Sequence, residues 1–228
     1  MSNFDDKKIN MSNLQKDKQK ISTATVAKMG MMVALLIVGA QVSIPLPFSP
    51  VPLTMQTLAV MLVAVVFKPL HALATVSIYV LMGTVGIPVF AGFRNFAAFA
   101  SPTGGFIVSF LPAVFVMSLF VSLIQKRFHI RYKTTTTLIT CSYKYNLAAT
   151  RITKYICLIL TTILFTVIVY AFGASWFIIF TRNFAAYPRP ILFGEALLLV
   201  TVPFLPGDAI KAAILILCFN RIAKLRKQ

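Results

Sequence analysis

The sequence predicts an all-α, polytopic integral membrane protein with six transmembrane helices and both termini in the cytosol. Hydrophobic residues make up 58% of the 228 residues and charged residues only 12%, with a mean hydropathy of +0.85. A soluble domain of this length cannot bury so much apolar surface, so the surplus must face lipid. The basic residues gather in the gaps between apolar runs, as they do in the cytosolic segments of membrane proteins.

The first three predicted spans are apolar runs bounded by proline and lysine. The first covers 26–44 and ends at a Pro-rich loop, 45–52, which cannot be regular helix. The second covers 53–67, which is shorter than the roughly 20 residues that cross hydrocarbon alone. Lys68 and Pro69 end it, and the third span follows at 70–87.

The last three predicted spans are separated by loops of different composition. A loop rich in Gly, Phe and Ala, 88–103, precedes the fourth span at 104–125. A polar segment with seven basic residues, 126–154, is predicted to be a cytosolic loop before the fifth span at 155–180. The sixth covers 191–220.

The sixth span is interrupted by Pro203, Pro206 and Gly207, which we expect to break the helix. Asp208 is then placed to cap the helix that follows.

The distribution of basic residues predicts the orientation. With the N-terminus inside, 18 of the 22 Lys and Arg residues fall on the inner side and three on the outer side, while Lys211 lies within a span. Both ends are therefore expected in the cytosol. The predicted organisation is a disordered cytosolic tail at 1–25, a single six-helix domain at 26–221, and a basic cytosolic tail at 222–228.

Several function classes are excluded by what the sequence lacks. The basic residues form no single surface for nucleic acid, and the Cys and His residues have no spacing typical of a metal site. No P-loop motif for ATP hydrolysis occurs. Segments around Ser175 and Asp208 resemble parts of intramembrane protease motifs but lack the partner His or second Asp that the chemistry needs. We predict no enzyme activity, cofactor or metal.

Asp208 and Lys211 are the candidate functional pair. Ionisable groups in lipid are costly, so an intramembrane pair indicates function. The two residues are three apart, on one helix face, and about 20 Å from the Arg221 boundary, which places them in the outer half of the bilayer. The alternative is a structural cap with its salt-bridge partner. Against it, a cation in the first turn opposes the helix dipole.

Two loops and one helix face are further candidates. The Pro-rich loop is typical of a binding region in transporters, or is an ordinary external turn. The glycine-containing loop 86–105 could cover a site as a lid. On the first span, Gly30 and Ala34 form a small-xxx-small pair that permits close helix approach, within the chain or to a partner.

Five segments resemble one known family in sequence and order. They are IPLP at 44–47, VPLTMQT at 51–57, YVLMGTVGIPVFAG at 79–92, PTGGF at 102–106 and PFLPGDAIKA at 203–212. In these motifs the chain resembles BioY, the biotin-specific S component family of energy-coupling factor (ECF) transporters.

The resemblance implies a membrane subunit that captures biotin at the outer face and mediates its uptake. It implies six helices, contact of Asp208 and Lys211 with biotin's polar groups, a bacterial inner-membrane location, and an ECF coupling subunit with two ABC-type ATPases as partners. The coupling subunit would dock on Gly30 and Ala34. The candidate binding residues are Asp208, Lys211, Asn95, Gly92, Thr103, Gly104, Gln56, Tyr79 and Trp176.

The chain departs from the family pattern in two places. In the loop before the fourth predicted span, residues 93–99 lack an expected Gly-rich run and Ser101 stands where Gly often precedes PTGG, which leaves the roles of Arg94 and Asn95 open. The segment 126–154 is longer and more basic than expected, as a binding site for anionic lipid headgroups or as an insertion. Alternative functions are an S component for thiamine or riboflavin, and a membrane scaffold without transport.

Overall fold

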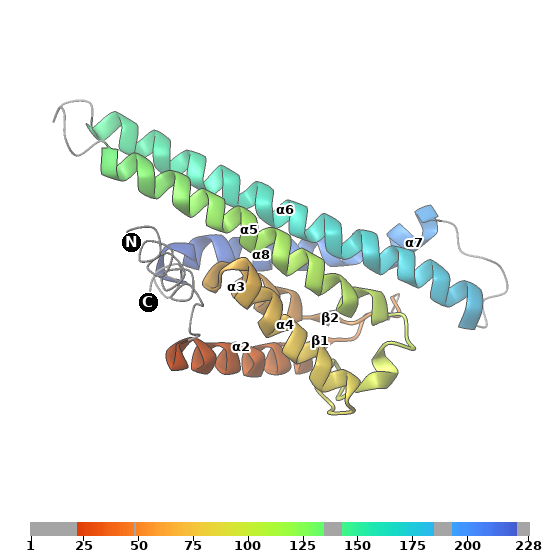
Figure 1. Cartoon of the computed structure of the whole chain (residues 1–228). Coiled ribbons are helices and arrows are strands. Elements are labelled where there is room, and N and C mark those ends of the chain that lie inside the picture. The colour runs from red at the N-terminus through yellow and green to blue at the C-terminus, as the bar shows by residue number, and fades with distance from the viewer. Residues whose placement is uncertain (1–21, 48, 135–142, 185–192, 223–228) are drawn as a thin grey trace, which may run out of the picture.

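The computed structural model describes residues 22–47, 49–134, 143–184 and 193–222 (Figure 1). Within them the chain is mostly helical, and successive long helices run in alternating directions between the two ends of a bundle. The predicted tails at 1–25 and 222–228 lie mainly outside the described residues. The tail boundary is wrong by a few residues, because helix α2 (Thr23–Gln41) already includes 23–25.

The Pro-rich loop contains the first difference from the all-α prediction. Its two arms pair as strands β1 (Ser43–Ile44) and β2 (Leu53–Thr54), antiparallel, with Ser43 opposite Thr54. Helix α2 therefore ends at Gln41, three residues before the predicted end, because the chain leaves the helix to form this ladder. The prolines lie between the two strands, where they need not donate hydrogen bonds.

The next two helices are short. Helix α3 (Gln56–Val66) has 11 residues and α4 (Pro69–Thr84) has 16, so α3 is about 16 Å long. The connection between them contains the carbonyl of Phe67, which accepts a 2.6 Å hydrogen bond from Ser118. This contact satisfies a backbone group that the helix break leaves without an intrahelical partner.

Helix α4 ends three residues before the predicted boundary because of Gly86. Gly86 has φ +107°, and its N–H donates to the carbonyl of Gly83 while Ile87 donates to Met82. This pair of bonds is the Schellman motif, which terminates a helix at a left-handed glycine. The loop that follows, residues 85–103, is named the outer loop after its predicted side of the membrane, and it includes the short 3-10 helix η1 (Phe96–Ala98).

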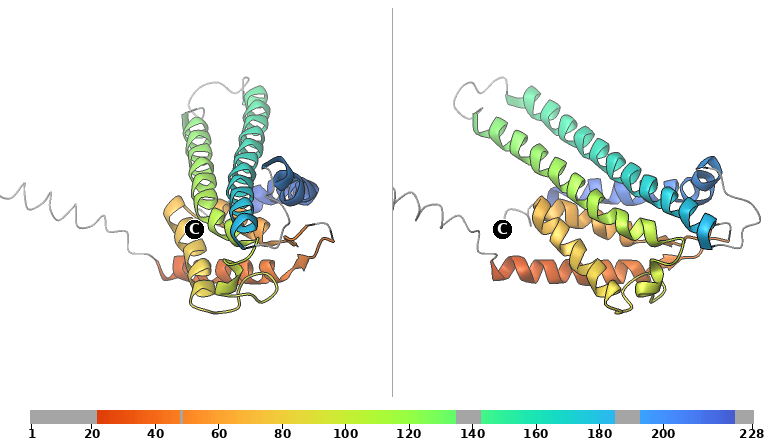
Figure 2. Two further views of the ribbon diagram at one scale, coloured as in Figure 1. Left: turned by 90° about the vertical axis from the view of Figure 1, so that its right-hand side faces the viewer. Right: turned by 45° about the vertical axis from the view of Figure 1, so that its right-hand side comes forward.

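The predicted cytosolic loop 126–154 is largely helix, which corrects the sequence prediction. Helix α5 (Gly104–Thr134) and helix α6 (Tyr143–Phe184) extend into it from both sides and lie side by side as a hairpin (Figures 1 and 2). At 1.5 Å per residue α6 is about 63 Å long, roughly twice the hydrocarbon thickness. Polar composition led to the loop prediction, although helices that leave the membrane also become polar.

The last span is broken near Pro203 as predicted, but the helix after the break starts about one turn earlier than the predicted N-cap at Asp208. Helix α7 (Phe193–Val200) is followed by the 3-10 helix η3 (Val202–Phe204), and α8 (Leu205–Ile222) begins before Pro206. Asp208 therefore lies in the first turn of α8 and is not its N-cap. Proline fits this turn because its missing N–H would have no intrahelical acceptor there.

The core lies between the helices, and much of the outer surface is apolar. A large buried cluster centres on α3 and α5, and a smaller one joins Val51, α6, α7 and Phe204. Leu70 and Leu217 are 73% and 80% exposed, as expected for side chains in lipid. Among the described residues, four helical segments are long and apolar enough to cross a membrane: 23–41, 104–125, 152–183 and 194–219.

Candidate functional site

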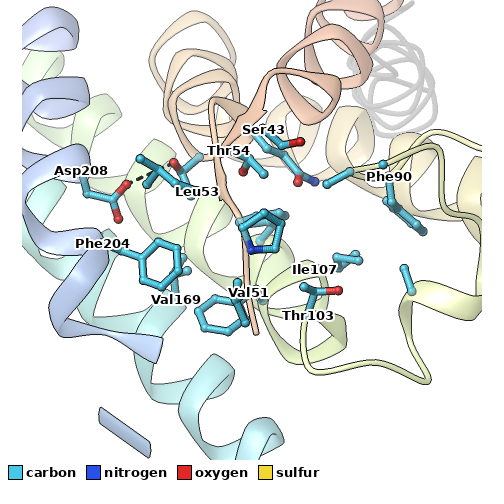
Figure 3. A pocket seen from close by; sticks show the side chains of 18 of the residues that line it. Ser43, Val51, Leu53, Thr54, Phe90, Thr103, Ile107, Val169, Phe204 and Asp208 are labelled. Carbon is cyan, nitrogen blue, oxygen red and sulfur yellow. Dashed lines mark hydrogen bonds between the residues drawn. The ribbon is translucent and has the colours of Figure 1, made fainter. Parts of the chain in front are cut away.

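A cavity of about 210 Å³ lies at the end of the bundle where β1 and β2 pair (Figure 3). A single water needs only about 10–15 Å³, so the space accommodates a multi-atom organic solute. Seven parts of the chain contribute to its wall: the β1–β2 arms, α3, the loop after α4, η3, and the starts or middles of α5, α6 and α8. Distant segments of sequence therefore converge on one site.

Asp208 and Lys211 form a buried ion pair in the wall of this cavity. The Lys211 Nζ lies 2.8 Å from the Asp208 Oδ1, and the two side chains are 4% and 10% exposed for Lys211 and Asp208. Charges in such an environment are stable only when paired and hydrogen-bonded. The pairing therefore explains how α8 carries both charges into an apolar bundle.

The sequence of α8 places the pair. The break at η3 frees α8 to begin near the cavity, and the i, i+3 spacing puts both side chains on one face. Gly207 allows the β1–β2 strand pair to approach α8 closely, since a Cβ on Gly207 would lie 3.0 Å from the Leu53 side chain. The helix thus presents its first turn directly to the Pro-rich loop.

Two hydroxyl groups from other helices complete the polar cluster. Thr57 of α3 accepts a 2.9 Å hydrogen bond from Lys211 Nζ and lies 3.4 Å from Asp208 Oδ1. Tyr170 of α6 donates a 2.5 Å hydrogen bond to Asp208 Oδ2. Hydrogen bonds to a charged group are among the stronger ones in proteins. Three helices are thereby joined at a single carboxylate.

The cluster retains hydrogen-bonding capacity toward the cavity. An ammonium has three N–H donors, and Lys211 uses two of them on described residues, Asp208 and Thr57. A carboxylate has about four lone-pair positions, and Asp208 uses three, on Lys211, Thr57 and Tyr170. Among the described residues this leaves one Lys211 donor and one Asp208 lone pair for a bound solute, which suits a solute edge with adjacent C=O and N–H groups.

The remaining wall is mainly apolar. Side chains around the cavity include Phe90, Ile107, Val169 and Phe204, and Figure 3 shows Phe204 and Val169 near Asp208 with Phe90 on the far side. Arg94, an exposed residue of the outer loop, adds a second cation to the lining. An apolar chamber with few polar groups is typical of small-molecule sites.

The outer loop covers the cavity with a tight turn between Phe90 and Arg94. These two residues exchange backbone hydrogen bonds of 2.9 and 3.3 Å, and both Gly92 (φ +71°) and Phe93 (φ +55°) have left-handed backbone conformations. Gln41, the last residue of α2, donates from its side-chain amide to the Phe90 carbonyl (3.0 Å) and accepts from the Phe93 N–H (3.2 Å). The amide of Gln41 therefore holds the strained turn at both sides.

Of the nine residues predicted from sequence as candidate binding residues, the structure brings five into the cavity wall. These five are Asp208, Lys211, Gln56, Gly92 and Thr103. They come from α8, α3, the outer loop and the position before α5.

Four predicted residues do not line the cavity but support its wall. Tyr79 accepts a 2.8 Å hydrogen bond from Gln56 and donates to the Val89 carbonyl at 3.2 Å. Asn95 caps η1 through the Ala97 N–H.

The other two supporting residues join α5 to α6. Trp176 donates from its indole to the Ser101 carbonyl at 3.1 Å. Gly104 leaves room for that indole, since a Cβ there would lie 2.9 Å from Trp176 Nε1.

Among the cavity residues that were not predicted as binding residues are Thr57, Tyr170 and Arg94. Thr57 ends the VPLTMQT motif, and its position beside a charged pair could not be derived from spacing. Tyr170 lies in a long apolar run, where an aromatic residue usually packs between helices. Arg94 departs from the family pattern, so the resemblance gave no role for it.

The small-residue pair on α2 lies away from the cavity. Gly30 and Ala34 are both exposed, and a Cβ built on Gly30 would meet nothing within 4 Å. Within the described residues, this face of α2 is therefore open to close approach by another helix.

Comparisons with known proteins agree on one family. The model of the BioY family matches residues 11–228. The "Probable biotin transporter BioY" of Pyrococcus horikoshii is 30% identical over 198 residues, covering 86% of this chain and 94% of that protein. The biotin transporter BioY of Rhodobacter capsulatus is 30% identical over 205 residues, covering 88% and 94%.

One solved structure has the same fold. The crystal structure of the S-component for biotin from an ECF-type ABC transporter matches with a TM-score of 0.66 and 23% identity, covering 93% of this chain and 94% of that one.

Proposed function

Because the chain belongs to the BioY family, we propose that it is the substrate-binding membrane subunit that captures biotin at the outer face and mediates its uptake. The protein is a transporter component and not an enzyme. The observation that carries the proposal is the buried Asp208–Lys211 pair, which offers one acceptor and one donor to a cavity of small-molecule size. Biotin's ureido ring has adjacent N–H and C=O groups that match them.

The orientation of biotin follows from the unequal ends of the cavity. We place the ureido ring at α8, with an N–H donated to Asp208 and the carbonyl accepting from Lys211. The bicyclic ring and aliphatic chain then lie against apolar residues such as Phe204 and Val169. The carboxylate meets Arg94, whose guanidinium matches a carboxylate in geometry and charge.

The charges of the site also favour biotin over the alternative vitamins. The cavity wall contains two cations, Lys211 and Arg94, and one anion, Asp208. This balance attracts an anionic solute, disfavours cationic thiamine, and leaves the Arg94 guanidinium without a carboxylate partner if riboflavin binds.

We propose six membrane crossings with both termini in the cytosol of a bacterial cell. Four segments are long and apolar enough to cross a membrane, and α3 and α4 supply two shorter passes between the same two ends of the bundle. The inner ends of the helices hold most of the basic residues. The cavity then opens near the outer surface.

An ECF module is the proposed energy source, consisting of a transmembrane coupling subunit and two ABC-type ATPases. The exposed face of α2 at Gly30 and Ala34 is the proposed docking position for the coupling subunit, because small residues allow helix backbones to approach closely. This face is separate from the biotin site, so docking and binding can be tested independently.

Calorimetry on the detergent-purified chain tests the function. Biotin is expected to bind tightly, thiamine and riboflavin not at all, and Asp208→Asn and Lys211→Ala to bind biotin far more weakly, though still measurably, while remaining folded. Arg94→Gln provides a control on orientation, because it should weaken biotin but leave the uncharged biotin amide unaffected. Folded wild-type protein that binds no biotin would overturn the proposal, and binding unaffected by both α8 variants would indicate a scaffold role for the pair.

A further inference from the structure

The hydroxyl of Tyr170 occupies one lone pair of the Asp208 carboxylate. It comes from α6, 38 positions earlier in the chain, and its 2.5 Å hydrogen bond is to Oδ2, the oxygen that Lys211 does not contact. The Tyr170 residue is only 8% exposed. The bond is therefore shielded from water, where a hydrogen bond to a carboxylate is strong.

The Tyr170 ring is fixed by its own packing. It belongs to the smaller apolar cluster, together with Ala174, Phe177, Val200 and Phe204. A ring packed on several sides points its hydroxyl in one direction. With Oδ1 held by Lys211 and Thr57, the plane of the carboxylate is fixed by contacts from three helices.

We propose that Tyr170 is a positioning and specificity residue, which limits Asp208 to a single acceptor direction toward the bound solute. This inference depends on the proposed biotin function. A carboxylate with one remaining lone pair accepts one N–H from the solute and has none to offer a second donor. The site therefore selects a solute edge with one donor beside one acceptor, and rejects an edge with two donors.

The analogue 2-iminobiotin supplies the two-donor edge, because an imino nitrogen replaces the ureido oxygen and is protonated near neutral pH. In the wild-type site, the ring N–H of the analogue takes the one remaining lone pair on Asp208. The imino group then faces the Lys211 ammonium, and no second lone pair on Asp208 is free to accept from it. Tyr170→Phe keeps the ring and removes only the hydroxyl. It frees a lone pair on Asp208 and allows the carboxylate to turn, so it should weaken biotin binding yet tolerate the analogue better.

Calorimetry with competitive displacement measures both ligands on four proteins: wild type, Tyr170→Phe, Asp208→Asn and the double variant. Tyr170→Phe is expected to weaken biotin about tenfold or more, the loss typical of one hydrogen bond to a charged group. The ratio of the 2-iminobiotin Kd to the biotin Kd should fall about tenfold. In the Asp208→Asn background, the same substitution should change biotin affinity by less than about twofold, since its effect acts through Asp208.

Tyr155→Phe is the matched control, because it makes the same substitution on the same helix about four turns away. It should change neither affinity nor the ratio. Should Tyr170→Phe fail to fold, 3-fluorotyrosine at position 170 keeps the shape and strengthens the donor, and should raise the ratio.

Tyr170→Phe could weaken biotin and 2-iminobiotin by the same factor, or could weaken biotin as much in the Asp208→Asn background as in wild type. Either result would overturn the inference while leaving the biotin function intact. Failure of the wild-type protein to bind biotin would overturn both the proposed function and the role of Tyr170.

Discussion

Asp208 and Lys211 each stabilise a charge that would be costly alone. Removing one partner leaves the other buried and uncompensated, at a cost of about 3–5 kcal/mol, whereas replacing both with apolar residues of similar size is often neutral. Thermal unfolding in detergent, followed by the fluorescence of the single Trp176, should therefore show a lowered Tm for Asp208→Asn. The double variant Asp208→Leu/Lys211→Met should unfold near the wild-type temperature.

Biotin titration of the same proteins completes this test. The double variant should be stable and yet bind no biotin, which separates the structural role of the pair from its role in recognition. A single variant as stable as wild type would contradict the burial of the pair.

The sequence could identify this pair but not its neighbours. Asp208 and Lys211 were predictable because charged residues within an apolar run require an explanation. Thr57 and Tyr170 belong to residue types that occur in membrane helices for many reasons, and only the packing of α3 and α6 against α8 brings them to the carboxylate. Trp176 differs from them in the opposite way, since it was predicted as a binding residue but donates to the Ser101 carbonyl and does not line the cavity.

At the scale of the elements, the α5–α6 hairpin depends on glycines that admit large side chains. A Cβ on Gly105 would lie 2.1 Å from the Cβ of Trp176, and one on Gly173 would lie 2.3 Å from the Phe106 ring. Gly105→Ala should therefore lower the free energy of unfolding by about 1–3 kcal/mol.

Gly30→Ala is the matched comparison for this effect. A Cβ there meets nothing within 4 Å, and alanine is the better helix former, so the isolated chain should be as stable as wild type or slightly more. Equal Tm losses in the two variants, measured side by side, would show that the close packing at Gly105 is not what stabilises the hairpin.

The turn between Phe90 and Arg94 gives a prediction about ligand release. Gln41 holds this turn through two hydrogen bonds, and Phe93 has a left-handed conformation that is costly for a residue with a Cβ. Gln41→Met keeps the length of the side chain and removes both bonds. We expect about a tenfold faster dissociation of biotin, measured by chasing bound radiolabelled biotin with unlabelled ligand.

Thr84→Val is the control for the turn, because it removes the nearby hydroxyl bond to the Leu81 carbonyl without touching residues 90–94. Its dissociation rate should match wild type. An unchanged rate in Gln41→Met would mean that the turn does not limit the exit of biotin.

Element boundaries were predictable from sequence only where a strong local signal was present. The start of α5 and the break near Pro203 were correct because Gly, Pro and the change in hydropathy coincide there. The end of α2 was not predictable because it depends on the pairing of β1 with β2. The end of α4 depends on a Schellman motif at Gly86, a residue that permits several conformations. The helical structure within 126–154 was also missed, because a polar sequence can continue a helix beyond the membrane.

At the scale of the whole molecule, the arrangement of the helices predicts which loops face outward. Lys68 lies in the short turn between α3 and α4, and Phe93 lies in the outer loop with 72% of its surface exposed. In a chain whose three cysteines are replaced by serine, Phe93→Cys should react with a membrane-impermeant maleimide in intact cells. Lys68→Cys should react only after permeabilisation, and labelling of both in intact cells would contradict the proposed orientation.

The overall class of the molecule followed from composition, whereas the six crossings predicted from the apolar runs stay a prediction. High hydropathy and the placement of basic residues were sufficient for a multi-span helical membrane protein, and the fold match agrees with this. Helices α3 and α4 are too short to be recognised as spans by length and hydropathy. In the proposed topology they cross the membrane packed against the longer helices around them.

In the proposed complex, biotin occupies this cavity with its ureido ring at α8. A structure determined with biotin bound is the most direct measurement. We expect the ureido N–H and carbonyl within hydrogen-bonding distance of Asp208 and Lys211, and the carboxylate beside Arg94. Biotin bound outside the cavity, or with its carboxylate at Lys211 and its ring at Arg94, would contradict the account.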